Sequence, residues 1–227
     1  MKYIVAVDGP SGAGKSTVSK LVAEKLGIAY LDTGAMYRAL ALKIVNEKTD
    51  LPAPFEKGEK AGKLEALLAD TEIEERDGRI FLDGRDVSGY IRMPEVAMIA
   101  SASSALPEVR AKLVAIQRKH GERWSVIADG RDIGSNVFPG AKYKFYLTAS
   151  PEERARRRRL ELKEKGLDIP FEKVLSDINE RDYADANRKV NPLTVAEGAE
   201  MLVTDGISAE QAADFIAEKV RAGETGS

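Results

Sequence analysis

The segment Gly9-Pro10-Ser11-Gly12-Ala13-Gly14-Lys15-Ser16 matches the pattern G-x-x-x-x-G-K-[ST] at every fixed position. It follows a short apolar run at 3–7 that is rich in β-branched residues, which is typical of a strand buried in a parallel sheet. Apolar residues then recur at helical spacing over 15–26, and Gly27 ends that pattern. A strand, a glycine-rich loop and a helix in this order predict a P-loop, which binds nucleotide phosphates.

Each part of this loop has a physical task. Glycines allow backbone N–H groups to converge on phosphate oxygens, and the helix N-terminus adds positive potential. We expect Lys15 to reach the β- and γ-phosphates of ATP and the Ser16 hydroxyl to bind Mg²⁺. A glycine-rich turn with a chance Lys-Ser pair is the alternative, but the flanking strand and helix favour a nucleotide. The predicted ATP contacts are Gly9, Pro10, Ser11, Gly12, Ala13, Gly14, Lys15, Ser16 and Thr17.

The rest of the chain predicts an α/β fold. A second strand and a second helix follow the P-loop helix, so the chain opens β-α-β-α, as in parallel sheets with crossover helices. We therefore expect a five-stranded parallel sheet flanked by helices, with strands at 3–7, 28–31, 125–128, 143–147 and 201–203. Helix starts are expected after Ser150 and Ser208, by their capping patterns, and at Pro94 and Pro107.

Residues 71–87 interrupt this alternation. Asp-Gly pairs at 77–78 and 83–84 lie between short strand-like runs, which is a strong hairpin signal. The pattern predicts a small antiparallel meander inserted in the α/β core.

Composition excludes several classes of function. The 227 residues contain no cysteine and one histidine, so disulfides, thiolate nucleophiles and cysteine or multi-histidine metal sites are excluded. Lys+Arg 35 against Asp+Glu 37 gives a net charge of -2, which argues against a nucleic-acid-coating protein. No apolar run approaches the roughly 20 residues of a membrane span, and the N-terminus does not have the pattern of a signal peptide. We expect a cytoplasmic protein, acting as a monomer on small molecules rather than on nucleic acid or membranes.

A phosphoryl transfer to a small acceptor suits a P-loop chain of this size. The sequence has no guanine-binding Asn/Thr-Lys-x-Asp motif, and motor and transport ATPases are far longer. Such a kinase needs a second anion site and a lid. Arg38 and Arg131 follow predicted strands, and the carboxyl ends of strands are where open α/β sheets bind ligands.

Four strings together resemble the bacterial cytidylate kinase family. They are the P-loop, Asp-Thr-Gly-Ala-Met-Tyr-Arg at 32–38, Ala-Asp-Gly-Arg-Asp-Ile-Gly at 128–134 and Glu-Arg-Asp at 180–182. The resemblance covers nearly the whole chain, including the meander, and adenylate, guanylate and shikimate kinases share only the P-loop. It implies a P-loop nucleoside monophosphate kinase fold. It also implies phosphorylation of CMP and dCMP by ATP, to CDP and dCDP, in pyrimidine nucleotide metabolism.

The resemblance also assigns residues to the acceptor. It places Ser101, Arg110 and Asp132 at the base, and the chemistry agrees because a carboxylate suits the N4 amino donor of cytosine and a guanidinium suits N3 and O2. The family positions that hold the CMP phosphate correspond here to Arg38, Arg131 and Arg188, and those near its sugar correspond to Arg181 and Asp185. Thr33 stands where some members of the family have Ser. A salt-bridged helix surface joining Arg181 to Asp185 is the alternative for that pair.

The arginine-rich segment at 151–170 predicts a lid. Arg154, Arg157 and Arg158 stand at i, i+3 and i+4, so they are expected to share the face toward the phosphates. Arg156 and Arg159 are expected to face solvent. A solvated basic helix and an RNA-binding patch are the alternatives, and the net charge and absence of aromatic residues in the run disfavour RNA.

The predicted reaction is a direct in-line transfer in which Lys15, Arg131 and the lid arginines Arg154, Arg157 and Arg158 supply positive charge. Asp129 is expected to hold Mg²⁺ through water. A kinase of UMP or of another small acceptor, and a P-loop ATP-binding regulatory or RNA-binding protein, remain as alternatives. The chain is predicted to form one kinase unit, with a core at about 1–32, 94–150 and 171–221, an acceptor region at 33–93, the lid at 151–170 and a frayed tail at 222–227.

Overall fold

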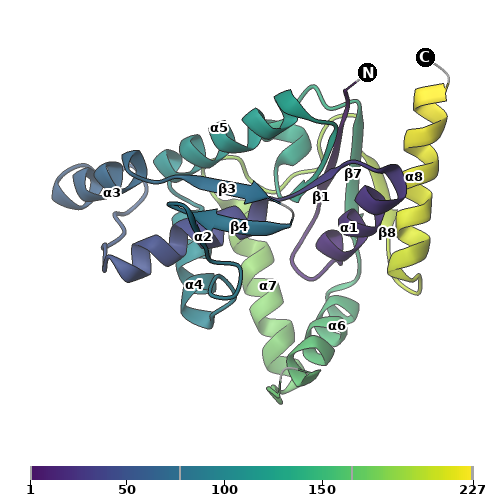
Figure 1. Ribbon diagram of the computed structural model, residues 1–227. Helices are drawn as coiled ribbons and strands as arrows, with labels where there is room; N and C mark the ends of the chain where they lie inside the picture. The colour runs from purple at the N-terminus through teal and green to yellow at the C-terminus, as the bar shows by residue number, and fades with distance from the viewer. Residues whose placement is uncertain (1, 77, 165, 226–227) are drawn as a thin grey trace. The chain divides into compact units, whose positions relative to one another are not determined.

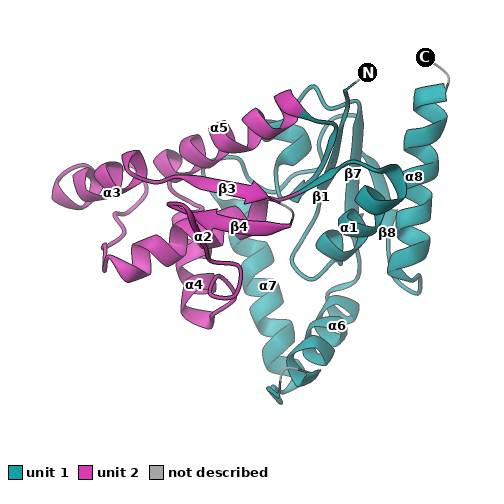
Figure 2. Cartoon of the chain, viewed as in Figure 1, with its two compact units in different colours: residues 1–30, 124–227 teal, residues 31–123 magenta. Residues whose placement is uncertain are grey.

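A computed structural model describes residues 2–76, 78–164 and 166–225. The described part of the chain divides into two compact units (Figure 2). Unit 1 comprises residues 1–30 and 124–227, and unit 2 comprises residues 31–123. The predicted acceptor region was shorter, at 33–93, so helices assigned to the core by the sequence belong to unit 2.

A parallel sheet forms the centre of unit 1. Among the described residues it contains five strands in the order β2-β6-β1-β7-β8, and the last two residues of β2 belong to unit 2. Strands β1, β7 and β8 of this sheet are labelled in Figure 1. Pairing is parallel between β1 and β6, between β1 and β7 and between β7 and β8, which confirms the predicted α/β class. The strands are β1 (Ile4–Asp8), β2 (Ala29–Asp32), β6 (Val126–Gly130), β7 (Tyr143–Thr148) and β8 (Glu200–Val203).

Helices α1 (Lys15–Leu26) and α8 (Ala209–Thr225) pack against each other and against the sheet. Their apolar faces meet the strands in a buried cluster that includes Val7, Val22 and Ile216. Helix α1 has the predicted bounds, and Gly27 ends it in the left-handed conformation at φ 64°. The apolar runs of β1 and α1 therefore place the loop between them, residues 9–14, at the carboxyl end of the sheet.

Helix α8 extends further than the sequence predicted. The tail was expected to fray after about Arg221, but the helix continues to Thr225, and residues 226 and 227 lie outside the described part. Glu224 accepts hydrogen bonds from Lys142 Nζ and from Tyr143 Oη, each at 2.7 Å. These contacts attach the last turn of α8 to the start of β7.

The other elements of unit 1 follow β6 and β7. The predicted capping box between Ser208 and Gln211 forms at the start of α8. At the start of α6, the Ser150 hydroxyl accepts the N–H of Glu153 as predicted, but the N–H of Ser150 donates to Asp205 instead of to Glu153. Apolar residues of α6 and α7 pack together around Ala155 and Ile178. These elements are the short π-helix η1 (Ile133–Val137), α6 (Pro151–Glu164) and α7 (Phe171–Asn187).

Unit 2 contains helices and the predicted meander. In the described residues its sheet has three strands in the order β3-β4-β5, and both pairings are antiparallel. Asp83 and Gly84 have φ of 48° and 78°, as a tight hairpin turn requires, whereas residue 77 of the other predicted turn lies outside the described residues. The elements are α2 (Thr33–Asn46), α3 (Glu59–Ala69), β3 (Ile73–Arg76), β4 (Arg79–Leu82), β5 (Arg85–Asp86), α4 (Pro94–Ser103) and α5 (Pro107–Arg123).

Candidate active site

The P-loop backbone requires its glycines. Gly9 has a φ of 151°, and a Cβ atom there would lie 1.9 Å from the carbonyl oxygen of Leu147, so any other residue would collide with β7. Gly14 precedes α1 in the left-handed conformation at φ 83° and, among the described residues, receives no side-chain cap. The first N–H groups of α1 therefore remain available to an anion.

Lys15 lies beneath the loop rather than in solvent. Its side chain is buried, and Nζ donates a hydrogen bond of 2.7 Å to the carbonyl oxygen of Pro10. Burial and the nearby guanidinium of Arg131 lower the pKa of Lys15. An anion bound in the loop would act in the opposite direction and stabilise the charged ammonium.

Ser16 and Asp129 lie side by side, as a shared magnesium site requires. The Ser16 hydroxyl donates to Asp129 Oδ2 at 3.0 Å, and Tyr30 Oη donates to Asp129 Oδ1 at 2.8 Å. Mg²⁺ prefers oxygen ligands and is commonly held by one or two protein groups together with substrate phosphates. A hydroxyl next to a carboxylate at the mouth of the P-loop fits that ion.

Ser11 is held by an ion pair that the sequence did not predict. Its backbone N–H donates to Asp182 Oδ1 at 3.0 Å, and its carbonyl oxygen accepts from Arg154 Nη1 at 2.9 Å. Arg154 and Asp182 also pair with each other, and Arg154 donates to the carbonyl oxygen of Ala149 at 2.9 Å. Arg154, expected on the lid face, is therefore buried and connects α6 and α7 to the P-loop.

The remaining arginines of α6 divide differently from the prediction. A Cβ atom on Gly14 would lie 4.0 Å from Arg157 Nη1, so Arg157 lies close to the P-loop, and its guanidinium donates to Thr204. Arg158 does not share this face, because its side chain is 46% exposed and pairs with Glu161. Arg157 and Arg158 lie on opposite sides of Arg154 around the helix, by about 60° and about 40°, and the contact with Thr204 is on the Arg157 side.

The predicted acceptor residues of unit 1 form ion pairs at the carboxyl end of β6. Arg131 donates to Asp185 Oδ2 at 2.6 Å, so Asp185 pairs with Arg131 rather than being limited to its helix neighbour Arg181. Arg188 donates to Asp132 Oδ1 at 3.2 Å, and both of these side chains are 7% exposed. Burial opposes ionisation of Asp185, but Arg131 outweighs it and holds the pKa of that carboxyl below its ordinary value.

Arg181, on α7 of unit 1, is exposed, and the remaining predicted acceptor residues belong to unit 2. Thr33 begins α2 and is buried, and Arg38 lies half-buried on the same helix. Arg110, on α5, is buried, donates to the carbonyl oxygen of Ser104 at 3.3 Å and lies over the ring of Tyr37. Ser101, on α4, is exposed.

Asp8 is a further carboxylate that sequence reasoning did not assign to the site. It is the last residue of β1, is 2% exposed, and accepts backbone hydrogen bonds from Ile133 at 2.7 Å and Gly134 at 2.8 Å. Burial raises its pKa to about 6, with the nearby Asp132 adding to the effect and Lys15 opposing it. The sequence signal that could have identified Asp8 is its position immediately before Gly9, the first residue of the P-loop.

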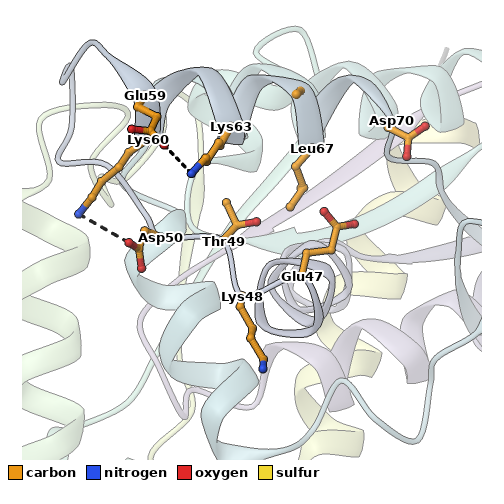
Figure 3. A pocket seen from close by; sticks show the side chains of 10 residues that line it. Glu47, Lys48, Thr49, Asp50, Glu59, Lys60, Lys63, Leu67 and Asp70 are labelled. Atoms are coloured by element: carbon orange, nitrogen blue, oxygen red, sulfur yellow. Dashed lines mark ion pairs between the residues drawn. The ribbon is translucent and has the colours of Figure 1, made fainter.

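A cavity of about 620 Å³ in unit 2 has a different character. It lies between the end of α2 and α3, where Lys60 pairs with Asp50 and Lys63 with Glu59 (Figure 3). Four acidic and three basic side chains line it, and none of the predicted site residues is among the described residues that line it.

Comparison with known proteins agrees with this geometry. The family model described as cytidylate kinase matches residues 5–222. The chain belongs to the cytidylate kinase family. The resemblance and the fold predicted from the sequence are thereby confirmed.

Similar chains carry the family name. A cytidylate kinase of Caldanaerobacter subterraneus subsp. tengcongensis is 48% identical over 96% of this chain and 94% of that protein. A cytidylate kinase of Caldicellulosiruptor bescii is 45% identical over 96% of this chain and 95% of that protein. A solved structure of an uncharacterized protein from Eubacterium ventriosum is 12% identical, covers 98% of this chain and 99% of that one, and superposes with a TM-score of 0.52. That last likeness concerns the fold alone.

The elevated pKa of Asp8 predicts a pH-dependent stability. Its folded pKa of about 6 lies above the ordinary value of 3.8 for an aspartate, so the folded state binds the proton more tightly than the unfolded state. The stabilisation of the folded state by this group is therefore present at low pH and is lost as the pH rises through about 6. We expect the stability advantage of wild type over Asp8→Asn to shrink by about 2 kcal/mol between pH about 4.5 and about 7.5. Denaturant unfolding at both pH values measures it, and a constant or growing difference would contradict the assignment.

Proposed function

We propose that this protein transfers the γ-phosphoryl group of ATP to CMP, and to dCMP, with release of ADP. The observation that carries the proposal is the family match from residue 5 to residue 222, in a chain whose relatives are named cytidylate kinase. A kinase of UMP or another acceptor, and a regulatory or RNA-binding ATPase, are not favoured by that match. A coupled assay of ADP release over a panel of nucleoside monophosphates tests all of these functions.

The donor side of the proposal rests on the P-loop. The uncapped N–H groups of α1 and the ammonium of Lys15 would hold the phosphates of ATP. Ser16 and Asp129 would hold Mg²⁺, directly or through water, and the ion would neutralise charge on the donor phosphates. Within the described residues, no helix is both long and apolar enough to span a membrane.

The acceptor side rests on the arginines and Asp132. Arg131, Arg188 and Arg38 would bind the phosphate of CMP, with Arg181 and Asp185 at its sugar. The Asp132 carboxylate would accept the N4 amino group of cytosine, with Arg110 and Ser101 at the other polar atoms of the base. Uracil presents an acceptor in place of that amino group, so a buried carboxylate would be left facing an oxygen, which disfavours UMP.

Catalysis would need positioning and positive charge rather than a general base. The phosphate oxygen of CMP is already ionised near neutral pH and can attack the γ-phosphorus directly. Lys15, Arg131 and Arg157 would neutralise the charge that spreads over the transferring group. Arg154 would act mainly by holding Ser11 in place, because its guanidinium already donates to the carbonyl oxygen of Ser11 and pairs with Asp182.

The first kinetic prediction concerns Lys15. Lys15→Ala should lower the turnover rate by about 10²–10³-fold, on the scale of one lost preorganised donor. The fold should persist, because the side chain ends at a loop carbonyl and not in the apolar core. Steady-state assays and thermal unfolding of the same preparation measure both effects. Near-normal turnover in a folded variant would contradict the role of the P-loop.

The second prediction concerns the choice of base. Asp132→Asn replaces a pure acceptor with an amide that also donates, so the ratio of kcat/KM for CMP to that for UMP should fall at least tenfold. Asp185→Asn is the matched control, because it removes a partly buried carboxylate that pairs with Arg131 and leaves Asp132, the residue proposed to read the base, in place. The control should lower both activities together and preserve the ratio. Equal ratios in the two variants would refute base reading by Asp132.

The third prediction compares neighbouring arginines of α6. Arg156 and Arg157 carry the same charge and pair with the same carboxylate, Glu153, but Arg156 is 69% exposed whereas Arg157 reaches Gly14. Arg157→Ala should lower kcat about tenfold or more, and Arg156→Ala should change it less than about twofold. Measuring kcat of both variants at saturating concentrations of ATP and CMP tests this difference. Similar losses would indicate a diffuse basic surface instead of a specific contact.

A further inference from the structure

Asp8 is an ionisable side chain in the interior of unit 1 whose partners are backbone groups of a different segment. It accepts hydrogen bonds from the N–H groups of Ile133 and Gly134, which lie at the start of η1. Among the described residues, Asp132 at the N-cap of η1 provides no side-chain cap for these donors. Buried N–H groups without acceptors are costly, so Asp8 supplies the cap from another strand.

The segment that Asp8 holds is closely packed. A Cβ atom on Gly134 would lie 3.4 Å from Asp8 Oδ2, 3.2 Å from Lys144 Cδ and 3.2 Å from Ala196 Cβ. These distances are tighter than most Cβ contacts, so a residue other than glycine would force its neighbours to shift. Of these three neighbours, Asp8 is the one whose side chain accepts hydrogen bonds from the turn at residues 131–134.

This turn carries the acceptor residues of unit 1. Arg131 and Asp132 immediately precede the N–H groups that Asp8 binds. The Asp132 carboxylate is further oriented by Asn136, whose Nδ2 donates to Oδ2 at 2.9 Å, and by Arg188 at Oδ1. A displacement of the turn would move the charge that reads the base and the guanidinium that binds phosphate.

The other side of Asp8 is the P-loop. Gly9 follows it directly and cannot shift toward β7, because of its close approach to the carbonyl oxygen of Leu147. The backbone of residues 8 and 9 is therefore held by the sheet. The side chain of Asp8 extends from that fixed point to the acceptor turn.

We propose that Asp8 is a positioning residue that holds the turn at residues 131–134 and thereby sets acceptor affinity and base selectivity. It does not touch the substrate in this account, and it acts through the N–H groups of Ile133 and Gly134. The predicted effect on acceptor affinity and base selectivity rests on the proposed function, whereas the predicted effect on the structure of the turn does not. An experiment can therefore contradict one of them and support the other.

The test compares Asp8→Asn with a core variant of unit 1. An amide has one acceptor oxygen, and its NH₂ group would face a backbone N–H, so one hydrogen bond is lost and one contact becomes unfavourable. Val220→Ala, on the buried face of α8, destabilises the same unit without touching the turn. KM for CMP, KM for ATP and the CMP-to-UMP ratio of kcat/KM are measured for both variants, with thermal unfolding as the check of folding.

We expect Asp8→Asn to raise KM for CMP at least tenfold, to change KM for ATP less than about threefold and to lower the CMP-to-UMP ratio. Val220→Ala should leave all three unchanged. Equal rises of both KM values, an unchanged ratio, or identical behaviour of the two variants would overturn the proposal. If Asp8→Asn does not fold, Gly134→Ala perturbs the same turn and should show the same acceptor-specific defect, and normal acceptor kinetics there would overturn the proposal.

Hydrogen exchange of the ligand-free protein separates the two hypotheses. Amides of residues 131–137 should exchange at least tenfold faster in Asp8→Asn, and the strand β1 should be unaffected. Unchanged exchange would refute the hold on the turn whatever the enzyme phosphorylates. A wild-type protein that releases no ADP with CMP would instead refute the proposed function and leave the exchange result intact.

Discussion

Ion pairs between arginine and aspartate determine how the carboxyl end of the unit 1 sheet is organised. A buried guanidinium without a partner costs several kcal/mol, so each one must be neutralised in the protein itself. Arg131 pairs with Asp185, Arg188 with Asp132 and Arg154 with Asp182. These aspartates balance the charge of an arginine-rich site within unit 1 itself.

This pairing has consequences for how a phosphate would bind. The arginines are already held in defined positions, which lowers the entropy lost when a ligand binds. A phosphate must also compete with carboxylates that are in place, so part of its interaction energy is offset. Electrostatic catalysis depends on fixed donors more than on strong ground-state binding, and the arrangement suits that requirement.

Local patterns made a large part of the fold predictable. The apolar run before Gly9, the helical spacing after Lys15 and the prolines at 94 and 107 each predicted an element that the structure contains. The Ser208 capping box formed because both partners lie within four residues of each other. Such signals depend only on the chain near them, and sequence patterns report them directly.

Contacts between distant segments were not predictable in this way. Asp182 reaches Ser11 across 171 positions and Asp8 reaches Gly134 across 126, and no local pattern reports either. The same limit explains Arg158. Helical spacing placed it near Arg154 and Arg157, but the tertiary contacts of α6 with Ser11, Asp182 and Thr204 are made by Arg154 and Arg157, and Arg158 pairs with Glu161 on its own helix.

The P-loop and the acceptor turn are specified by different kinds of group. The P-loop presents backbone N–H groups, so its geometry depends on glycines such as Gly9 and on the side chains of Arg154 and Asp182 that hold the backbone of Ser11. The acceptor turn presents the side chains of Arg131 and Asp132, whose positions depend on every group that packs around them. The backbone of Asp8 leads directly into the P-loop, and its carboxylate accepts hydrogen bonds from the acceptor turn. Acceptor selectivity should therefore be the more sensitive of the two to substitutions in the surrounding core, because a side chain can shift without breaking the sheet whereas the P-loop backbone cannot.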